Sequence, residues 1–372
     1  MTLTPALKRI RHLSRELAAD FGTRAARHDQ ERSVPLENYA LLREAGMGGL
    51  AIPETYGGLG HGLGGWVIAG EELAQGCGST ALSFAGHIAA TGMIMEDTTV
   101  DESAKELVAH HVINEGKLIA LPDQQSGAPI SAVRIPGGYR LHGKVMQATM
   151  WEAADYALLL ARPEGESGEE ITLLAPTSGP GATVHDVWQA LGLRAMRSQT
   201  VTLDGLVVPE RSIIARHPVG SRAWLLGSGT AAALGIGVGI HQLIRRVVAG
   251  QAATADSERR LAQMTCELDA ARLALRHGVL LHEERHHGTH RQFLSARYLT
   301  CTAVSNASRS AVSACGTRSL MQQLGLERMV RDAVTAISLA PDEDQSLSQI
   351  GKMEVGGMRR PTQGEESRYA AL

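Results

Sequence analysis

The chain has 372 residues, of which 44% are hydrophobic and 20% charged, and its formal net charge is −3. Such a composition is ordinary for a globular protein, and the length predicts two or three domains. Because the net charge is slightly negative, nothing favours nucleic acid or an anionic membrane surface as a partner. Aromatic residues make up only 3%, so we expect a largely aliphatic interior, which suits helix bundles.

The four cysteines, at positions 77, 266, 301 and 315, include no C-x-x-C pair. This scatter predicts reduced thiols and a cytoplasmic protein. The first residues lack the apolar stretch of a signal peptide, so we expect none. The longest apolar run, Gly229 to Ile240, covers about twelve residues and is too short to span a bilayer.

Residues 1–115 have the periodicity of helices and are predicted to form the first domain. Apolar side chains recur every three or four residues at Ala6, Ile10, Leu13, Leu17 and Phe21, and again at Leu36, Tyr39, Leu42 and Met47. The helix over 38–45 is predicted to end at Gly46, a typical C-terminal helix signal. Glycines and a proline between residues 52 and 60 then interrupt regular structure, and a further helix follows.

Residues 116–215 have a β pattern and are predicted to form the second domain. After the turn signal at Gly137, residues 139–145 alternate between apolar and polar, and residues 157–161 form a continuous apolar run. The first pattern is typical of a half-buried strand and the second of a strand covered on both faces. We predict that the two form a β-hairpin. Further strands are expected at 171–175 and 201–208.

Residues 216–355 are helical again and are predicted to form the third domain. The expected helices are Leu225–Val248, Ser257–Leu281, Phe293–Ala314 and Leu320–Ile337. Four such helices predict an antiparallel bundle. Residues 356–372 are predicted to be a polar tail.

Three features are suggestive of other functions, and we interpret each as structural. Residues 282–286 fit H-E-x-x-H, a zinc motif, but they lie at an expected helix end before Gly288. Residues 235–239 resemble a dinucleotide-binding loop, but no strand precedes them, so we expect close helix packing. His87 is expected to be a hydrogen-bonded residue on a helix face rather than a catalytic one.

Several ordered stretches resemble the acyl-CoA dehydrogenase superfamily. They are residues 43–60 (REAGMGGLAIPETYGGLG) with residues 71–87 (EELAQGCGSTALSFAGH), residues 143–162, and residues 190–214 (ALGLRAMRSQTVTLDGLVVPERSII). The resemblance covers nearly the whole chain. It implies an α+β, mostly α fold, with an N-terminal helical domain, a middle β-barrel or sandwich domain and a C-terminal four-helix bundle. It also implies a homodimer or a homotetramer.

The same resemblance implies a flavin cofactor, FAD or FMN, and a few of the residues that bind it. Thr149 stands where the family places a threonine that hydrogen-bonds the flavin ring. Ser126 keeps one hydroxyl of the segment that binds the pyrophosphate. Gly316 and Thr317 stand in the loop that meets the flavin of a neighbouring subunit. Other family contacts differ in this sequence.

The carboxylate that removes a proton from the substrate in the family's dehydrogenases is absent from both of its usual positions. One usual position, in the loop after the Arg331-Asp332-Ala333 helix, holds Ala340, and the other holds Gly229. Glu343 lies three residues further on and would serve as the catalytic base only if the loop is rebuilt.

Three hypotheses therefore remain open. The chain is a flavin-dependent oxidoreductase of the monooxygenase type, receiving reduced flavin from a reductase partner and needing no proton-abstracting base. Alternatively, it is a dehydrogenase of thioesters of coenzyme A or an acyl carrier protein, with Glu343 as a relocated base. In the third, the flavin is lost and the chain is a non-catalytic partner subunit or a non-redox enzyme.

Overall fold

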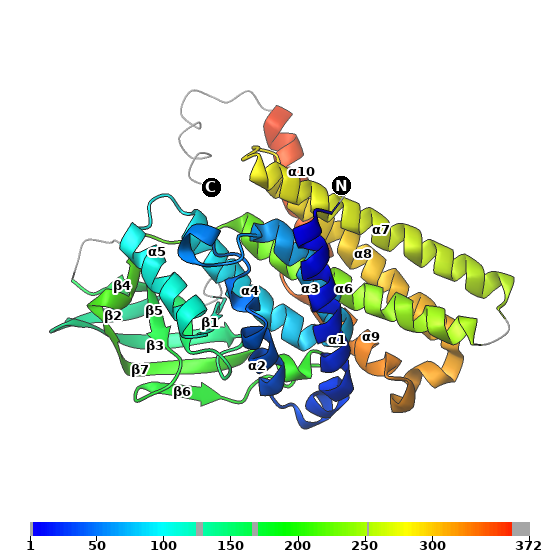
Figure 1. Cartoon of the computed structure of the whole chain (residues 1–372), viewed down its shortest axis with the longest axis horizontal. Coiled ribbons are helices and arrows are strands. Elements are labelled where there is room, and N and C mark those ends of the chain that lie inside the picture. Colours follow the sequence, from blue (N-terminus) through cyan, green and yellow to red (C-terminus); the bar gives the residue numbers. More distant parts are fainter. Residues whose placement is uncertain (1–2, 124–128, 166–169, 251–252, 359–372) are drawn as a thin grey trace.

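A computed structural model describes residues 3–123, 129–165, 170–250 and 253–358. In chain order, helices come first, then a sheet, then helices again (Figure 1). The sheet lies on one side of the molecule, the long C-terminal helices lie on the other, and α4 runs between them. This arrangement confirms the predicted α+β, mostly α fold.

The N-terminal helices fold much as predicted. They are α1 (Pro5–Glu31), α2 (Leu36–Glu44), α3 (Gly62–Gly76), α4 (Gly78–Glu96) and α5 (Glu102–Ala109), with short helical turns η1 (Met47–Gly49), η2 (Glu54–Tyr56) and η3 (His110–Asn114). The Thr4 side chain caps α1 by accepting from the Leu7 amide at 3.2 Å. Gly46 has φ 67°, a left-handed conformation that glycine adopts without strain, and α2 ends just before it.

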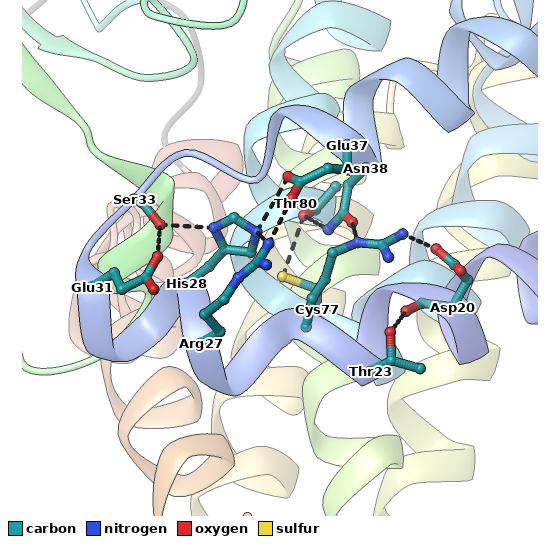
Figure 2. Close-up of polar contacts among 11 residues, drawn as sticks. Asp20, Thr23, Arg27, His28, Glu31, Ser33, Glu37, Asn38, Cys77 and Thr80 are labelled. Carbon is teal, nitrogen blue, oxygen red and sulfur yellow. Dashed lines mark hydrogen bonds and ion pairs between the residues drawn. The ribbon is translucent and has the colours of Figure 1, made fainter.

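A series of hydrogen-bonded polar side chains holds α1 and α2 against α4 (Figure 2). The Asn38 amide, fully buried on α2, donates to the Thr80 hydroxyl on α4 at 2.8 Å, and Thr80 donates to the Cys77 sulfur at 3.2 Å. The Nε of Arg24 on α1 donates to the side-chain oxygen of Asn38, Oδ1, at 2.7 Å. Because buried polar groups are costly unless they are paired, these hydrogen bonds fix the relative position of the three helices.

The middle of the chain forms one eight-stranded sheet. The strands are β1 (Ile119–Ala120), β2 (Ile130–Ile135), β3 (Gly138–Ala148), β4 (Tyr156–Pro163), β5 (Ile171–Pro176), β6 (Ala182–His185), β7 (Gln199–Pro209) and β8 (Ile213–Ala215). Their order is β6-β7-β3-β2-β4-β5-β8, and β1 pairs with β4.

The predicted hairpin between residues 139–145 and 157–161 is wrong. Strand β2 lies between β3 and β4, pairing antiparallel with β3 and parallel with β4. The true hairpin is β2–β3, turning at Gly137. The turn signal is therefore real, but it joins a different pair of strands, because neighbouring order along the chain does not fix strand pairing.

The C-terminal helices are α6 (Arg222–Ala249), α7 (Ala255–Glu283), α8 (Thr289–Cys315), α9 (Leu326–Ser338) and α10 (Glu343–Met358). Two expectations need correction. Helix α9 begins only at Leu326, because Leu320 ends the short turn η6 (Gly316–Leu320) and the short turn η7 (Gln322–Leu324) follows it. A fifth helix, α10, lies beyond the four that are predicted, and it runs to Met358, inside the stretch expected to be a polar tail.

The glycines of α6 allow close helix packing, as predicted for residues 235–239. A Cβ at Gly235 would lie 2.3 Å from the Glu71 carbonyl oxygen of α3, and one at Gly237 would lie 2.8 Å from Val304 of α8. By length and composition α6 could cross a membrane, but 89% of its most apolar window is buried inside the fold. The helix is thus accounted for as a core element.

Candidate functional site

Two hydroxyl groups meet at one end of the β3–β7 pair. Thr149 directly follows β3 and Ser198 directly precedes β7, and the antiparallel register pairs Ala148 with Gln199. The Thr149 and Ser198 side-chain oxygens are consequently 2.7 Å apart. Ser198 is 4% exposed, while Thr149 is half-buried. The sequence identified Thr149 but not its partner.

The two segments that carry these hydroxyls have strained backbones. Among non-glycine residues, Gln147 (φ 45°) and Met150 (φ 64°) flank Thr149, and Leu193 (φ 51°) and Arg197 (φ 44°) lie just before Ser198. A left-handed conformation is costly for such residues, of order 1–3 kcal/mol each, and clusters at functional sites. Four such residues around one pair of hydroxyls mark this place as a candidate site.

An ion pair clamps the two segments together. Arg197 donates from Nε and Nη2 to the two carboxylate oxygens of Glu152, at 2.8 and 3.1 Å. Its remaining nitrogen donates to the Arg32 carbonyl at the end of α1, at 3.0 Å. The hydrogen bonds to Glu152 raise the pKa of Arg197. Because the planar guanidinium makes two hydrogen bonds to one carboxylate, the contact fixes the relative orientation of the two side chains as well as their distance.

The site offers hydrogen-bond donors to a ligand. Two hydroxyls carry two hydrogens, and their mutual bond uses one. Among the described residues, the other hydrogen has only a long bond from the Thr149 hydroxyl to the Gln147 carbonyl, at 3.4 Å, which a bond to a ligand can replace. Four residues before Ser198, the Nε of Arg194 is buried and has no hydrogen-bond partner among the described residues. These donors suit a ligand that presents acceptor atoms or negative charge.

The segment expected to supply a catalytic base is held from inside the protein. Arg297 of α8, 5% exposed, donates to three main-chain carbonyls of the α9–α10 connection: Ala336 at 2.9 Å, Leu339 at 2.7 Å and Pro341 at 2.8 Å. Burial lowers the pKa of Arg297. Ala340, at the usual position of the base, thus lies in a connection fixed on both sides by hydrogen bonds.

Glu343 is the first residue of α10 and is engaged with α8. Its Oε1 accepts from the Thr302 hydroxyl at 3.1 Å. The neighbouring Asp342 caps the helix, accepting from the Gln345 amide at 2.8 Å. Acidic side chains at a helix N-terminus are favoured by the helix dipole, which accounts for the acidic run 342–344. Within the described ranges, no contact connects Glu343 with Thr149 or Ser198.

Gly229, the other usual position of a base, faces open space. A Cβ built there meets no atom within 4 Å. The residues on either side, Ser228 and Thr230, are each 1% exposed, and their hydroxyls have no partner in the described part of the chain. There is room for a side chain here, but the sequence provides none.

The remaining predicted site residues are not brought to Thr149. Ser126 lies outside the described residues. Gly316 and Thr317 are exposed and begin η6, which follows α8 and packs on α8 and α9. Their expected contact with a neighbouring subunit's flavin stays a prediction.

The histidine-rich motif does not have the geometry of a zinc helix. Helix α7 ends at Glu283, so His286 is not on the same helical turn as His282. His282 instead pairs with Glu96 at 3.0 Å, and His286 accepts from the Gly288 amide at 3.0 Å. No group of three or more His, Cys, Asp or Glu residues suited to a metal occurs in the described part of the chain.

His87 is a structural histidine, as predicted. It is fully buried on α4; its Nδ1 accepts from the Ile119 amide at 2.9 Å, so its Nε2–H donates to the Gly48 carbonyl at 3.0 Å. Burial lowers the pKa of His87 to about 4. The neutral ring thus joins η1 to β1.

Family models match both helical parts of the chain. The acyl-CoA dehydrogenase N-terminal domain matches residues 4–109, and the acyl-CoA dehydrogenase C-terminal domain matches residues 226–338. Together the matched stretches span more than half of the chain. The chain belongs to the acyl-CoA dehydrogenase family. The resemblance noted in the sequence is thereby confirmed.

Individual members of the acyl-CoA dehydrogenase family resemble the chain at moderate identity. A putative acyl-CoA dehydrogenase, YdbM of Bacillus subtilis, is 26% identical over 363 residues, covering 90% of this chain and 93% of YdbM. The amino sugar nitrososynthase DnmZ of Streptomyces peucetius is 27% identical over 259 residues, covering 66% of this chain and 63% of DnmZ. The structure of the dibenzothiophene monooxygenase TdsC from Paenibacillus sp. A11-2 has the same fold, with a TM-score of 0.83, 20% identity, and 95% and 98% of the two chains covered.

Proposed function

We propose that this member of the acyl-CoA dehydrogenase family is a flavin-dependent oxidoreductase that works without a proton-abstracting carboxylate. We place FAD or FMN with its ring against Thr149 and Ser198. When bound, a flavin supplies two-electron redox chemistry and, once reduced, reaction with dioxygen. The family's usual carboxylate is needed only where a proton is taken from the substrate carbon next to a thioester carbonyl.

The residues present fit a flavin. The second hydroxyl hydrogen of the Thr149–Ser198 pair, held only by the 3.4 Å bond to the Gln147 carbonyl, can be donated to the ring, where it meets charge that develops on reduction. The unpartnered Arg194 Nε supplies a second donor nearby in sequence. The Arg197–Glu152 clamp holds both segments in their strained conformations, so the donors are positioned before the ligand arrives.

The observation that carries the proposal is the set of three hydrogen bonds from Arg297. Because they fix the main chain from Ala336 to Pro341, the loop is not free to bring Glu343 to the position of Ala340 without breaking them. Gly229 contributes no side chain. We therefore favour the monooxygenase type, in which a reductase partner delivers reduced flavin. The similarity to DnmZ supports this choice, because making a nitroso group is an oxidation at nitrogen.

Flavin binding is tested by titrating the purified protein with FAD and with FMN and following the flavin absorbance and fluorescence. We expect saturable binding, and we expect Thr149→Val to weaken it about tenfold, the effect of losing one buried hydrogen bond. Thr183→Val, at an exposed position on β6, is the matched control and should leave the affinity unchanged. A protein that takes up neither flavin would contradict the proposal and favour the non-catalytic partner subunit.

A further inference from the structure

A groove with a largely polar lining runs beside α1. One part, of about 420 Å³, lies between α1, α3, α6 and α7, and a second part, of about 730 Å³, continues between α1, α3, α6 and α9. The two parts share Arg15, Glu72, Gln75 and Gln242 and are therefore contiguous. Together they are the size of a small-molecule site.

The groove is rich in arginine although the chain as a whole is slightly negative. Three carboxylates and six arginines line its two parts: Glu71, Glu72, Asp269, Arg11, Arg15, Arg246, Arg272, Arg276 and Arg328. Isolated guanidinium groups gathered in one concave surface repel one another, so such an excess is favourable only where anions neutralise it.

The three carboxylates are already occupied. Glu72, 6% exposed, pairs with Arg15 at 3.1 Å and Arg11 at 3.5 Å, while Glu71, 7% exposed, accepts from Arg272 at 2.8 Å. Asp269 also pairs with Arg272. The two buried acids, Glu71 and Glu72, and the exposed Asp269 hold these arginines in place through direct ion pairs.

Two of the six groove arginines make no direct ion pair within the described part of the chain. Neither Arg276 nor Arg246 has a hydrogen-bond or ion-pair partner among the described residues, and the Arg276 Nε is buried. Burial lowers the pKa of Arg276; Glu71 and Asp269 oppose this effect, while Arg272 and Arg11 add to it. A buried guanidinium donor without an acceptor is costly, and the residue that carries this one lines the first part of the groove.

The other lining residues narrow the class of ligand. Apolar contacts come from Ile68, Val238 and Leu273 in the first part and from Leu243, Leu324 and Met329 in the second. No aromatic side chain is among the described lining residues, so a base has nothing to stack on. Guanidinium groups match the geometry of phosphate oxygens.

We propose that this groove is a second ligand site, separate from the Thr149–Ser198 site, which binds a non-aromatic molecule carrying a phosphate or diphosphate group. Arg276 and Arg246 bind the anionic group, and the acid-anchored Arg11 and Arg15 assist. None of the residues of the strained segments 147–152 and 193–198 lines the groove. The proposal does not depend on the flavin chemistry.

The test uses inorganic pyrophosphate as the probe, titrated into the full chain by calorimetry at constant ionic strength, with and without saturating FAD. We expect saturable binding that FAD leaves unchanged, and we expect Arg276→Gln and Arg246→Gln each to weaken it about tenfold. Arg276→Gln removes a cation without a partner, so it should fold normally, and Arg246→Gln changes an exposed residue.

Arg259→Gln is the matched control, because Arg259 is on the same helix, paired with Asp256 at 2.8 Å, about 25 Å along the axis from Arg276. It should bind pyrophosphate as the unmodified chain does. Binding that FAD displaces would assign the anion to the flavin site and overturn the proposal. Equal weakening by all three variants, or no binding at millimolar pyrophosphate, would overturn it too.

Discussion

The guanidinium of Arg297 donates to the main-chain carbonyl of Leu339 at 2.7 Å, from inside the bundle. With the bonds to Ala336 and Pro341, it holds the end of α9 and the connection to α10, where the sequence resemblance leads us to look for a catalytic carboxylate. A buried arginine bonded to carbonyls rather than to a carboxylate keeps its charge next to this loop and fixes the loop's course. The shape of the candidate site thus depends on a residue that does not contact Thr149.

Arg297→Ala should destabilise the fold by about 3–5 kcal/mol, since it removes the donor from one buried and two partly buried carbonyls and creates a cavity. Urea unfolding measures the change. Arg291→Ala is the control: Arg291 is on the same helix, exposed and paired with Glu354, and its loss should cost less than about 1 kcal/mol. Similar costs for the two variants would show that the three bonds contribute little.

Two glycines of α6 should respond to alanine in opposite directions. At Gly229 a Cβ enters open space, so Gly229→Ala should stabilise the protein by about 0.5–1 kcal/mol through helix propensity. At Gly235 a Cβ would lie 2.3 Å from the Glu71 carbonyl oxygen, so Gly235→Ala should destabilise it by about 1–3 kcal/mol. Thermal unfolding of the pair compares them directly, and a loss of stability in Gly229→Ala would mean that the space is filled.

His87 should make the protein less stable in mild acid. Its pKa is about 4 in the folded protein and about 6.5 in the unfolded chain, so the unfolded chain binds the extra proton first. Its stabilising contribution is complete above pH 6.5 and is lost as the pH falls toward 4, about 2 kcal/mol between pH 8 and pH 5. His241 and His290, whose pKa values burial also lowers, act in the same direction.

The His87 contribution is isolated by comparing urea unfolding at pH 8 and pH 5 for the unmodified chain and for His87→Gln. The variant should be less stable at pH 8, and its stability should change less between the two pH values. The same pH dependence in both proteins would assign the effect to the other histidines.

The Arg197–Glu152 clamp should matter for ligand affinity more than its surface position suggests. Arg197→Lys keeps the charge but loses the two-pronged contact, so flavin affinity should fall about fivefold to tenfold. Arg211→Lys, an exposed arginine on the turn η5 (Glu210–Ser212), should not change it. Unchanged affinity in Arg197→Lys would mean that the strained segments hold their conformation without the clamp.

Much of the fold could be predicted from the sequence, because apolar periodicity and glycine signals report local structure. The pairing of strands could not: β2 inserts between β3 and β4, and its position depends on contacts across the sheet rather than on neighbouring residues. The acidic stretch at 342–344 follows a proline and has the composition of a loop, although acids also favour helix starts. This ambiguity conceals α10.

Of the candidate site, only Thr149 could be found, through its place in a recognisable stretch. Ser198 becomes its partner through the β3–β7 register, which links residues 49 positions apart. The left-handed backbones at Gln147 and Arg197 have no sequence signal, because neither residue type favours that conformation. Arg297 shares its helix face with the buried Phe293, Leu294 and Cys301, but an arginine is so rarely buried that its type argues against a core position.

We propose that the chain holds a flavin but provides no carboxylate to remove a substrate proton. The most direct measurement is anaerobic mixing of the flavin-loaded protein with a panel of acyl-CoA thioesters, following the absorbance of the oxidised flavin. We predict that the absorbance persists with every thioester, in the unmodified chain and in Glu343→Gln alike. Bleaching by a thioester that Glu343→Gln abolishes would contradict the account and identify Glu343 as a working base.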